Sequence, residues 1–126
     1  VAKRVAIKDS LIGTGFPSRS MAQLDEFLAY FRQLTLDGAG LRRPGAAALD
    51  LAYVAAGRFD AFFEMGLSPW DVAAGALLIT EAGGLIGDFE GEAEHLFGGR
   101  VLAANPALFA LMIQRFSSIY NKHQVQ

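Results

Sequence analysis

The sequence contains no cysteine, which excludes disulfide bonds and thiolate metal sites. It also has no apolar run close to the ~20 residues that a membrane-spanning helix needs. Basic residues are not in excess, because the sequence has 11 lysines and arginines and 13 aspartates and glutamates, which gives a net charge of −2. Such a balance gives no support for nucleic-acid binding, which usually requires a basic patch. We therefore expect no membrane or nucleic-acid partner, and we take a cytoplasmic location as the default.

The composition is that of a packed domain. Of the 126 residues, 52% are hydrophobic and 19% are charged, which is typical of a globular core and argues against disorder. The length corresponds to a single domain. If such a domain is one half of a larger layered molecule, one of its faces should remain apolar and exposed.

Short apolar runs and helical patterns follow one another along the chain, which predicts an α/β fold. Extended segments are predicted at 11–15, 41–44, 58–64, 85–89 and 100–104. Helices are predicted to begin at Ser20, to cover 46–56 and 68–82, and to start again at Pro106. The last helix is expected to fray after Tyr120, where the sequence becomes polar.

Two carboxylates flank a tight turn in the middle of the chain. Glu64 ends a predicted strand, and Asp71 lies in the first turn of the next predicted helix. Carboxylates at a strand-to-helix corner are typical ligands of a hard cation near a phosphate ester. Another interpretation is available for each: Ser68 and Asp71 have the spacing of a capping box, and Glu64 could be a solvated acid at a strand end. Trp70 is interpreted as a packing anchor beside this turn.

Other acidic residues are interpreted as structural. Asp50 and Asp60 lie in apolar segments, and a buried acid normally needs a partner. Arg42, Arg43 or Arg58 could supply the compensating charge. Arg42 and Arg43 are adjacent, and the alternatives for them are a phosphate contact, salt bridges or an interface.

Four motifs occur in a fixed order. They are Thr14-Gly15-Phe16-Pro17, the run Gly45-Ala-Ala-Ala-Leu-Asp50-Leu-Ala-Tyr-Val-Ala-Ala-Gly57-Arg58, the run Trp70-Asp71-x-Ala-Ala-Gly75-x-x-Leu-x-x-Glu81-Ala-Gly-Gly84, and Ala103-Ala-Asn105-Pro106. Together they resemble the C-terminal signature of the inositol monophosphatase family of Mg²⁺-dependent phosphomonoesterases, in particular its bacterial members. The resemblance extends from about Leu11 to about Phe116.

The resemblance implies an α/β fold in which a mixed β-sheet flanked by helices forms the C-terminal layers of an αβαβα sandwich. It also implies site residues. Asp71 corresponds to a Mg²⁺ ligand, and Glu64 corresponds to a glutamate that binds sugar hydroxyls. Gly45 and Ala47 correspond to positions whose backbone amides approach the inositol ring. No catalytic residue is assigned beyond these metal and substrate contacts.

Family enzymes carry most of their metal ligands in an N-terminal half, in a Gly-Glu-Glu segment and an Asp-Pro-x-Asp-Gly-Thr segment, and neither occurs here. We therefore expect residues 1–126 to be one C-terminal half-domain of a larger phosphatase whose N-terminal half is absent. The intact enzyme is expected to hydrolyse a phosphate monoester with Mg²⁺, most simply myo-inositol monophosphate to inositol and phosphate. The isolated chain is expected to be inactive.

The family further implies a phosphorylated polyol as the partner molecule, a homodimer and inhibition by lithium. Family members also act on fructose 1,6-bisphosphate, NADP or histidinol phosphate, and these substrates remain open. An alternative from another class is a non-catalytic binding or oligomerisation module derived from the same fold.

Overall fold

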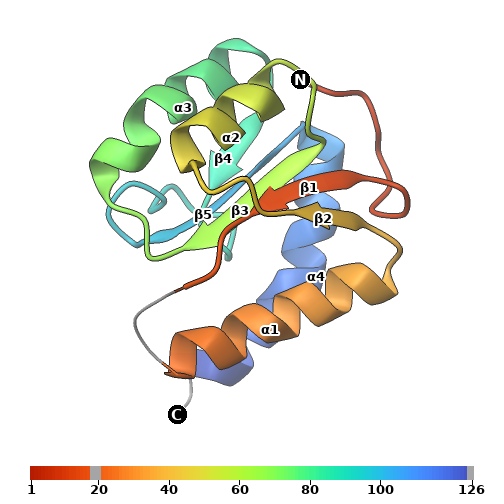
Figure 1. Ribbon diagram of the computed structural model, residues 1–126, viewed down its shortest axis with the longest axis vertical. Coiled ribbons are helices and arrows are strands. Elements are labelled where there is room, and N and C mark those ends of the chain that lie inside the picture. The colour runs from red at the N-terminus through yellow and green to blue at the C-terminus, as the bar shows by residue number, and fades with distance from the viewer. Residues whose placement is uncertain (18–20, 125–126) are drawn as a thin grey trace.

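The computed structural model describes residues 1–17 and 21–124. Over these residues the chain forms five strands and four helices, in the order that the sequence predicts (Figure 1). They are β1 (Leu11–Thr14), α1 (Met21–Leu36), β2 (Gly40–Arg42), α2 (Ala47–Ala55), β3 (Ala61–Met65), α3 (Pro69–Glu81), β4 (Leu85–Gly87), β5 (Arg100–Ala104) and α4 (Pro106–Gln124). Ser20, the predicted start of the first helix, lies outside the described residues.

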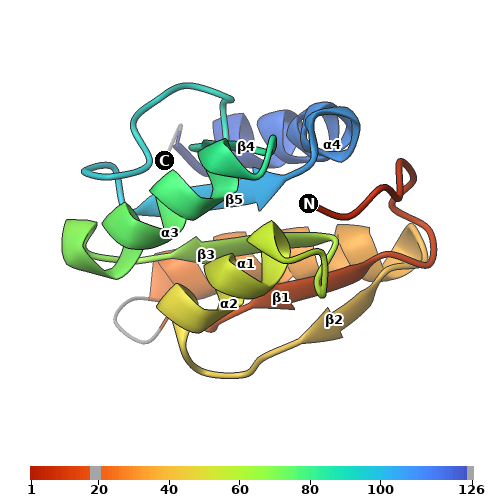
Figure 2. The same ribbon diagram turned by 90° about the horizontal axis from the view of Figure 1, so that it is seen from above.

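The strands form one mixed sheet in the order β2-β1-β3-β5-β4. Strand β1 is parallel to both β2 and β3, whereas β5 is antiparallel to β3 and β4. Helices cover both faces: α1 and α4 lie on one side of the sheet, and α2 and α3 lie on the other (Figures 1 and 2). The expected α/β fold, a mixed sheet flanked by helices, is therefore confirmed.

The central strand β3 shows how the two faces are divided. Ala61, Phe63 and Met65 belong to the core beneath α1 and α4, while Phe62 belongs to the core beneath α2 and α3. Successive side chains of a strand point to opposite faces. Glu64 therefore shares the α2/α3 face with Phe62, and this alternation decides on which side of the sheet its carboxylate lies.

The core beneath α1 and α4 is built from aromatic rings. The ring of Tyr30 lies 4.4 Å from that of Phe116 and 4.9 Å from that of Phe89, measured between centroids. Phe63 on the sheet packs edge-on against Phe116 at 5.2 Å. Contacts of this geometry add to the free energy gained from burying the rings. They join α1, α4 and the sheet in one core.

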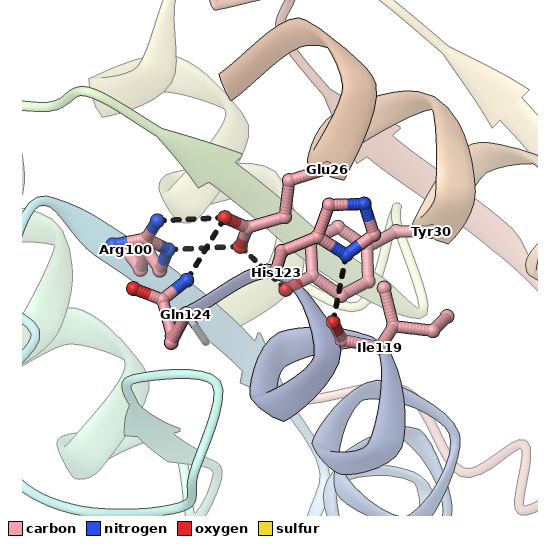
Figure 3. Close-up of polar contacts among 6 residues, drawn as sticks. All are labelled: Glu26, Tyr30, Arg100, Ile119, His123 and Gln124. Carbon is pink, nitrogen blue, oxygen red and sulfur yellow. Dashed lines mark hydrogen bonds and ion pairs between the residues drawn. The ribbon is translucent and has the colours of Figure 1, made fainter. Parts of the chain in front are cut away.

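The end of α4 differs from the prediction. The helix continues to Gln124 and does not fray after Tyr120. The amide Nε2 of Gln124 donates a hydrogen bond to Glu26 at 3.2 Å, and the ring Nδ1 of His123 lies 2.8 Å from the carbonyl oxygen of Ile119 (Figure 3). A tertiary contact to α1 therefore holds this polar turn in place.

Glu26 is the centre of a polar network on that face (Figure 3). Glu26 is only 2% exposed. The guanidinium of Arg100 donates to both carboxylate oxygens, at 3.0 and 2.7 Å, and the hydroxyl of Tyr30 donates at 2.6 Å. The network links α1, β5 and α4, so a buried charge is fully compensated where three elements meet.

Candidate functional site

A pocket of about 400 Å³ opens at the carboxyl ends of the parallel strands. Its volume lies in the range of small-molecule sites. It is lined by Gly15, Phe16, Arg43, Gly45, Ala46, Ala47, Ala48, Glu64, Leu67 and Asp71. The structure thus brings together all four residues predicted for the site: Glu64, Asp71, Gly45 and Ala47.

The topology explains the position of this pocket. Helices α1 and α2 connect β1 to β2 and β2 to β3, and they pack into the cores of opposite faces. The chain therefore leaves β1 toward one neighbour and later returns to its other neighbour. In open α/β sheets, ligands bind at the carboxyl ends of the strands where this change of direction occurs.

Glu64 lies on β3 with its carboxylate against the backbone of Gly15. A Cβ atom at position 15 would come within 2.6 Å of the Glu64 carboxyl carbon, so a side chain there would displace the carboxylate. The hydroxyl of Thr14 donates to the carbonyl oxygen of Phe63 at 2.7 Å and ties the end of β1 to β3. Gly15 is a site residue that the sequence analysis did not assign. Its only local signal is a glycine directly after a strand, which can mark a close approach of another group.

The pocket alters the protonation of Glu64. Burial, and then the nearby carboxylates of Asp50 and Asp71, raise the pKa of Glu64 from 4.5 to about 7, while Arg43 acts in the opposite direction. At neutral pH the carboxyl group is therefore divided between its two forms. A protonated carboxyl group can donate one hydrogen bond to a ligand hydroxyl, whereas a carboxylate only accepts.

Asp71 lies in the first turn of α3, at the side of the pocket. Its Oδ2 accepts a hydrogen bond from the backbone N–H of Ser68 at 3.0 Å. The capping interpretation of this acid is therefore confirmed. In this capping box the Asp71 side chain accepts from one backbone N–H through one carboxylate oxygen, so the cap is compatible with a second role for Asp71 in the pocket.

The first turn of α2 forms another wall. Gly45 has φ +94°, in the left-handed region that favours glycine, although nothing lies close enough to obstruct a Cβ atom there. The N-cap residue is Ala46, which has no side-chain acceptor for the first-turn amides. The start of α2, including Ala47, therefore presents uncapped backbone N–H groups beside the pocket.

Arg43 is the cation of the pocket wall. Its guanidinium lies 5.1 Å from the centre of the Phe16 ring, and Phe16 in turn packs edge-on against the buried Phe27 at 5.1 Å. Stacking on an aromatic ring orients a guanidinium group. Arg43 lies at the rim of the pocket. It forms no ion pair within the described residues, so the salt bridge that was one alternative for it is not formed.

Among the described residues, neither Asp50 nor Asp60 forms an ion pair with Arg42, Arg43 or Arg58, so the predicted partners were wrong. Asp60 pairs with Arg4, at 3.5 Å between Nε and Oδ2, and accepts a hydrogen bond from the backbone of Leu11 at 2.7 Å. Asp50 is fully buried, and neither of its carboxylate oxygens has a hydrogen-bond partner in the described part of the chain. Arg4, which lies in the segment before β1, is therefore the partner of Asp60 that local sequence could not reveal.

Asp50→Asn is expected to leave the free energy of unfolding nearly unchanged near pH 3 and to raise it by up to about 3 kcal/mol near pH 8. Burial raises the pKa of Asp50 from 3.8 to about 6, so the folded chain binds this proton more tightly than the unfolded chain. The wild-type chain therefore loses stability as the pH rises through this interval, and the variant lacks this contribution. Urea unfolding at several pH values tests this, and parallel pH profiles would contradict it.

Trp70 does not pack as an anchor in this chain. It is 81% exposed, and Leu77 and Leu78 on the same helix are 62% and 48% exposed. The opposite side of α3 is buried and consists of Val72, Gly75 and Ile79. Helix α3 therefore carries apolar residues on its exposed side as well as on its buried side. The expected exposed apolar face is therefore present, and it begins next to Asp71.

Residues 1–17 and 21–124 contain no group of three or more histidine, cysteine, aspartate or glutamate side chains placed to hold a metal ion. Among the helices of the same residues, none is both long and apolar enough to cross a membrane.

Comparison with known sequences gives a consistent result. A family model described as the inositol monophosphatase family matches residues 1–120. The chain is 53% identical over 115 residues to the Nus factor SuhB of Pseudomonas aeruginosa, covering 90% of this chain and 42% of that protein. It is 48% identical over 108 residues to the inositol-1-monophosphatase of Mesorhizobium japonicum, covering 86% of this chain and 41% of that protein. The chain thus spans less than half the length of these relatives.

Solved structures agree with this result. The extragenic suppressor protein suhB of Bartonella henselae superposes with a TM-score of 0.86 at 38% identity, over 92% of this chain and 44% of that one. The inositol monophosphatase of Anabaena superposes with a TM-score of 0.81 at 36% identity, over 94% of this chain and 47% of that one.

Proposed function

Because the chain belongs to the inositol monophosphatase family, we propose that it forms the C-terminal part of a Mg²⁺-dependent phosphatase that hydrolyses a phosphate monoester, with myo-inositol monophosphate as the leading substrate. The observation that carries the proposal is the pocket at the strand ends. It gathers Glu64, Asp71, Gly45 and Ala47, the residues that the family resemblance singles out.

Asp71 is proposed to supply one carboxylate ligand to Mg²⁺. Magnesium prefers octahedral coordination by oxygen, and one carboxylate cannot hold several ions with useful affinity. Since the described residues contain no group of three metal-ligating side chains, the chain does not fit a complete metal site by itself. The remaining ligands would come from outside this chain, and the isolated chain would be inactive.

The exposed side of α3 supports the same division of the molecule. An apolar stripe on α3 is exposed to solvent in this chain, and it consists of Trp70, Leu77 and Leu78. Large exposed apolar surfaces usually mark an interface. We propose that the N-terminal half of the intact protein covers this stripe and brings its metal ligands beside Asp71.

Glu64 and the amides at the start of α2 are proposed to bind the alcohol part of the substrate. A carboxyl group beside several backbone N–H donors can pair with neighbouring hydroxyl groups, and a ligand without those hydroxyls would leave buried groups unpaired. This arrangement favours an inositol- or sugar-like alcohol. A homodimer, lithium inhibition and a cytoplasmic location belong to the same proposal.

The test is a hybrid in which this chain replaces the segment that it matches in the Mesorhizobium japonicum inositol-1-monophosphatase. We expect Mg²⁺-dependent phosphate release from inositol 1-phosphate by the hybrid and none by the 126-residue chain alone. Release by the chain alone would disprove the half-site proposal. A folded, metal-binding hybrid without release would disprove the phosphatase proposal.

A second candidate function is a non-catalytic binding module. The observation that favours it is that several relatives carry the name Nus factor SuhB, among them the protein of Pseudomonas aeruginosa. In that case the exposed stripe on α3 would bind another protein, and the pocket residues could be replaced without consequence. The hybrid separates the two candidates, because only the phosphatase proposal predicts release that depends on Asp71.

A further inference from the structure

Asp50 is a buried acid that the proposed function does not use. It lies on α2, has no exposed surface, and neither oxygen has a hydrogen-bond partner within residues 1–17 and 21–124. Burying a carboxyl group without a partner costs free energy, so such groups are uncommon in folded proteins. An exception of this kind next to a ligand pocket suggests a role at that pocket.

The position of Asp50 relates it to Glu64. Helix α2 packs against α3 and the central strands, and Asp50 belongs to its first turn, where the preceding residues Ala47 and Ala48 line the pocket. Glu64 points from β3 to this same face of the sheet. Of the two carboxylates that act on Glu64, Asp50 has the larger electrostatic effect and Asp71 the smaller. Asp50 therefore acts from behind the wall that a ligand would touch.

The charged groups around Glu64 come from three parts of the chain. Asp50 lies on α2, Asp71 lies at the start of α3, and Arg43 lies in the segment after β2. Arg43 is the only cation among the residues that line the described pocket, and its guanidinium is stacked on Phe16. Glu64 thus shares one region with two other carboxyl groups and one cation at its rim, and the two neighbouring carboxylates disfavour the ionised form of Glu64.

We propose that Asp50 is a positioning residue for Glu64, and that its buried carboxyl group determines whether Glu64 meets a ligand hydroxyl as a hydrogen-bond donor or as an acceptor. The inference rests on the proposed role of Glu64 in binding the alcohol part of the substrate. Two carboxyl groups that interact in a poorly solvated region titrate as a pair, and one proton is retained over a wide pH interval. While Asp50 is ionised, that proton stays on Glu64, which can then donate to one hydroxyl and accept from another.

The experiment follows the carboxyl carbon of Glu64 by NMR during a pH titration of the full chain, without metal or substrate. Asp50→Asn should move the midpoint of Glu64 downward from about 7 by at least about half a pH unit, because a nearby negative charge is lost. Asp60→Asn is the matched control, since Asp60 pairs with Arg4 and does not act on Glu64. It should leave the midpoint in place.

Asp50 loses its proton while Glu64 still holds its own, so Glu64→Gln should leave the midpoint of Asp50 close to about 6, a value that burial alone accounts for. If the chain alone does not fold, the same spectra are recorded on the hybrid enzyme. Equal Glu64 midpoints in folded Asp50→Asn and Asp60→Asn proteins would overturn the inference.

A second readout uses the hybrid enzyme. Asp50→Asn should shift the pH dependence of KM for inositol 1-phosphate and leave kcat nearly unchanged, which a purely structural role would not do. An unshifted KM profile would overturn the inference. The titration needs neither metal nor substrate, so a coupled titration with an inactive hybrid would refute the proposed function alone, and an active hybrid without coupling would refute the role of Asp50 alone.

Discussion

Asp71→Asn in the hybrid enzyme is expected to lower Mg²⁺-dependent phosphate release at least about a hundredfold. The substitution removes the negative charge that we propose as a Mg²⁺ ligand and keeps the shape of the side chain. The amide oxygen of asparagine can still accept the hydrogen bond that the Ser68 backbone donates to the present carboxylate. The start of α3 should therefore be preserved, so the loss would arise from the metal site. Phosphate release at saturating Mg²⁺ and the apparent Mg²⁺ affinity both measure it.

The control for this substitution lies on the same helix. Glu81→Gln removes a carboxylate from the other end of α3, where the side chain is exposed and far from the pocket. It should leave release within about twofold of the parent hybrid, as surface substitutions usually have small effects. Equal activity of the Asp71→Asn and Glu81→Gln hybrids would remove Asp71 from the metal site and would favour the capping role alone.

Arg100→Met is expected to lower the free energy of unfolding by about 3–5 kcal/mol, because removing one partner of a buried ion pair leaves the other charge uncompensated. The Arg100 side chain is 19% exposed and that of Glu26 is 3% exposed. Methionine retains much of the apolar stem of the arginine, so the loss is mainly one of charge and hydrogen bonds. Two donors to Glu26 disappear, while the hydroxyl of Tyr30 and the amide of Gln124 remain. Urea unfolding monitored by circular dichroism gives the change.

Arg115→Met is the matched control on the same side of the molecule. Arg115 also forms an ion pair, with Asp37 at 2.9 Å, but its side chain is 52% exposed. Exposed pairs contribute about 0–1 kcal/mol, so this variant should unfold nearly as the wild type does. If both variants lost the same small amount, the Glu26 network would not be a buried charge centre in solution. Adding Glu26→Gln to Arg100→Met should recover part of the loss, because the uncompensated charge is then gone.

Most secondary structure could be predicted because its signals are local. Ser68 and Pro69 predict the start of α3, the glycines at 83 and 84 predict its end, and Asn105 with Pro106 predicts the start of α4. Caps and turn residues act within a few positions of the backbone groups that they satisfy, so a short stretch of sequence contains the whole interaction. The end of α4 was mispredicted for the converse reason, since its last turn is held by Glu26 on another helix.

The sequence by itself determined the order of strands and helices, the seven-residue spacing from Glu64 to Asp71 and the family resemblance. Only the tertiary structure decided that Gly15 must lack a side chain beneath Glu64, and that Arg43 stacks on Phe16 at the rim of the pocket. It alone also decided that Asp60 is paired through Arg4 whereas Asp50 remains without a partner. The physical reason is that local pattern reports the backbone conformation of each segment. The partner of a buried charge depends on which segments, distant in the chain, the sheet brings together.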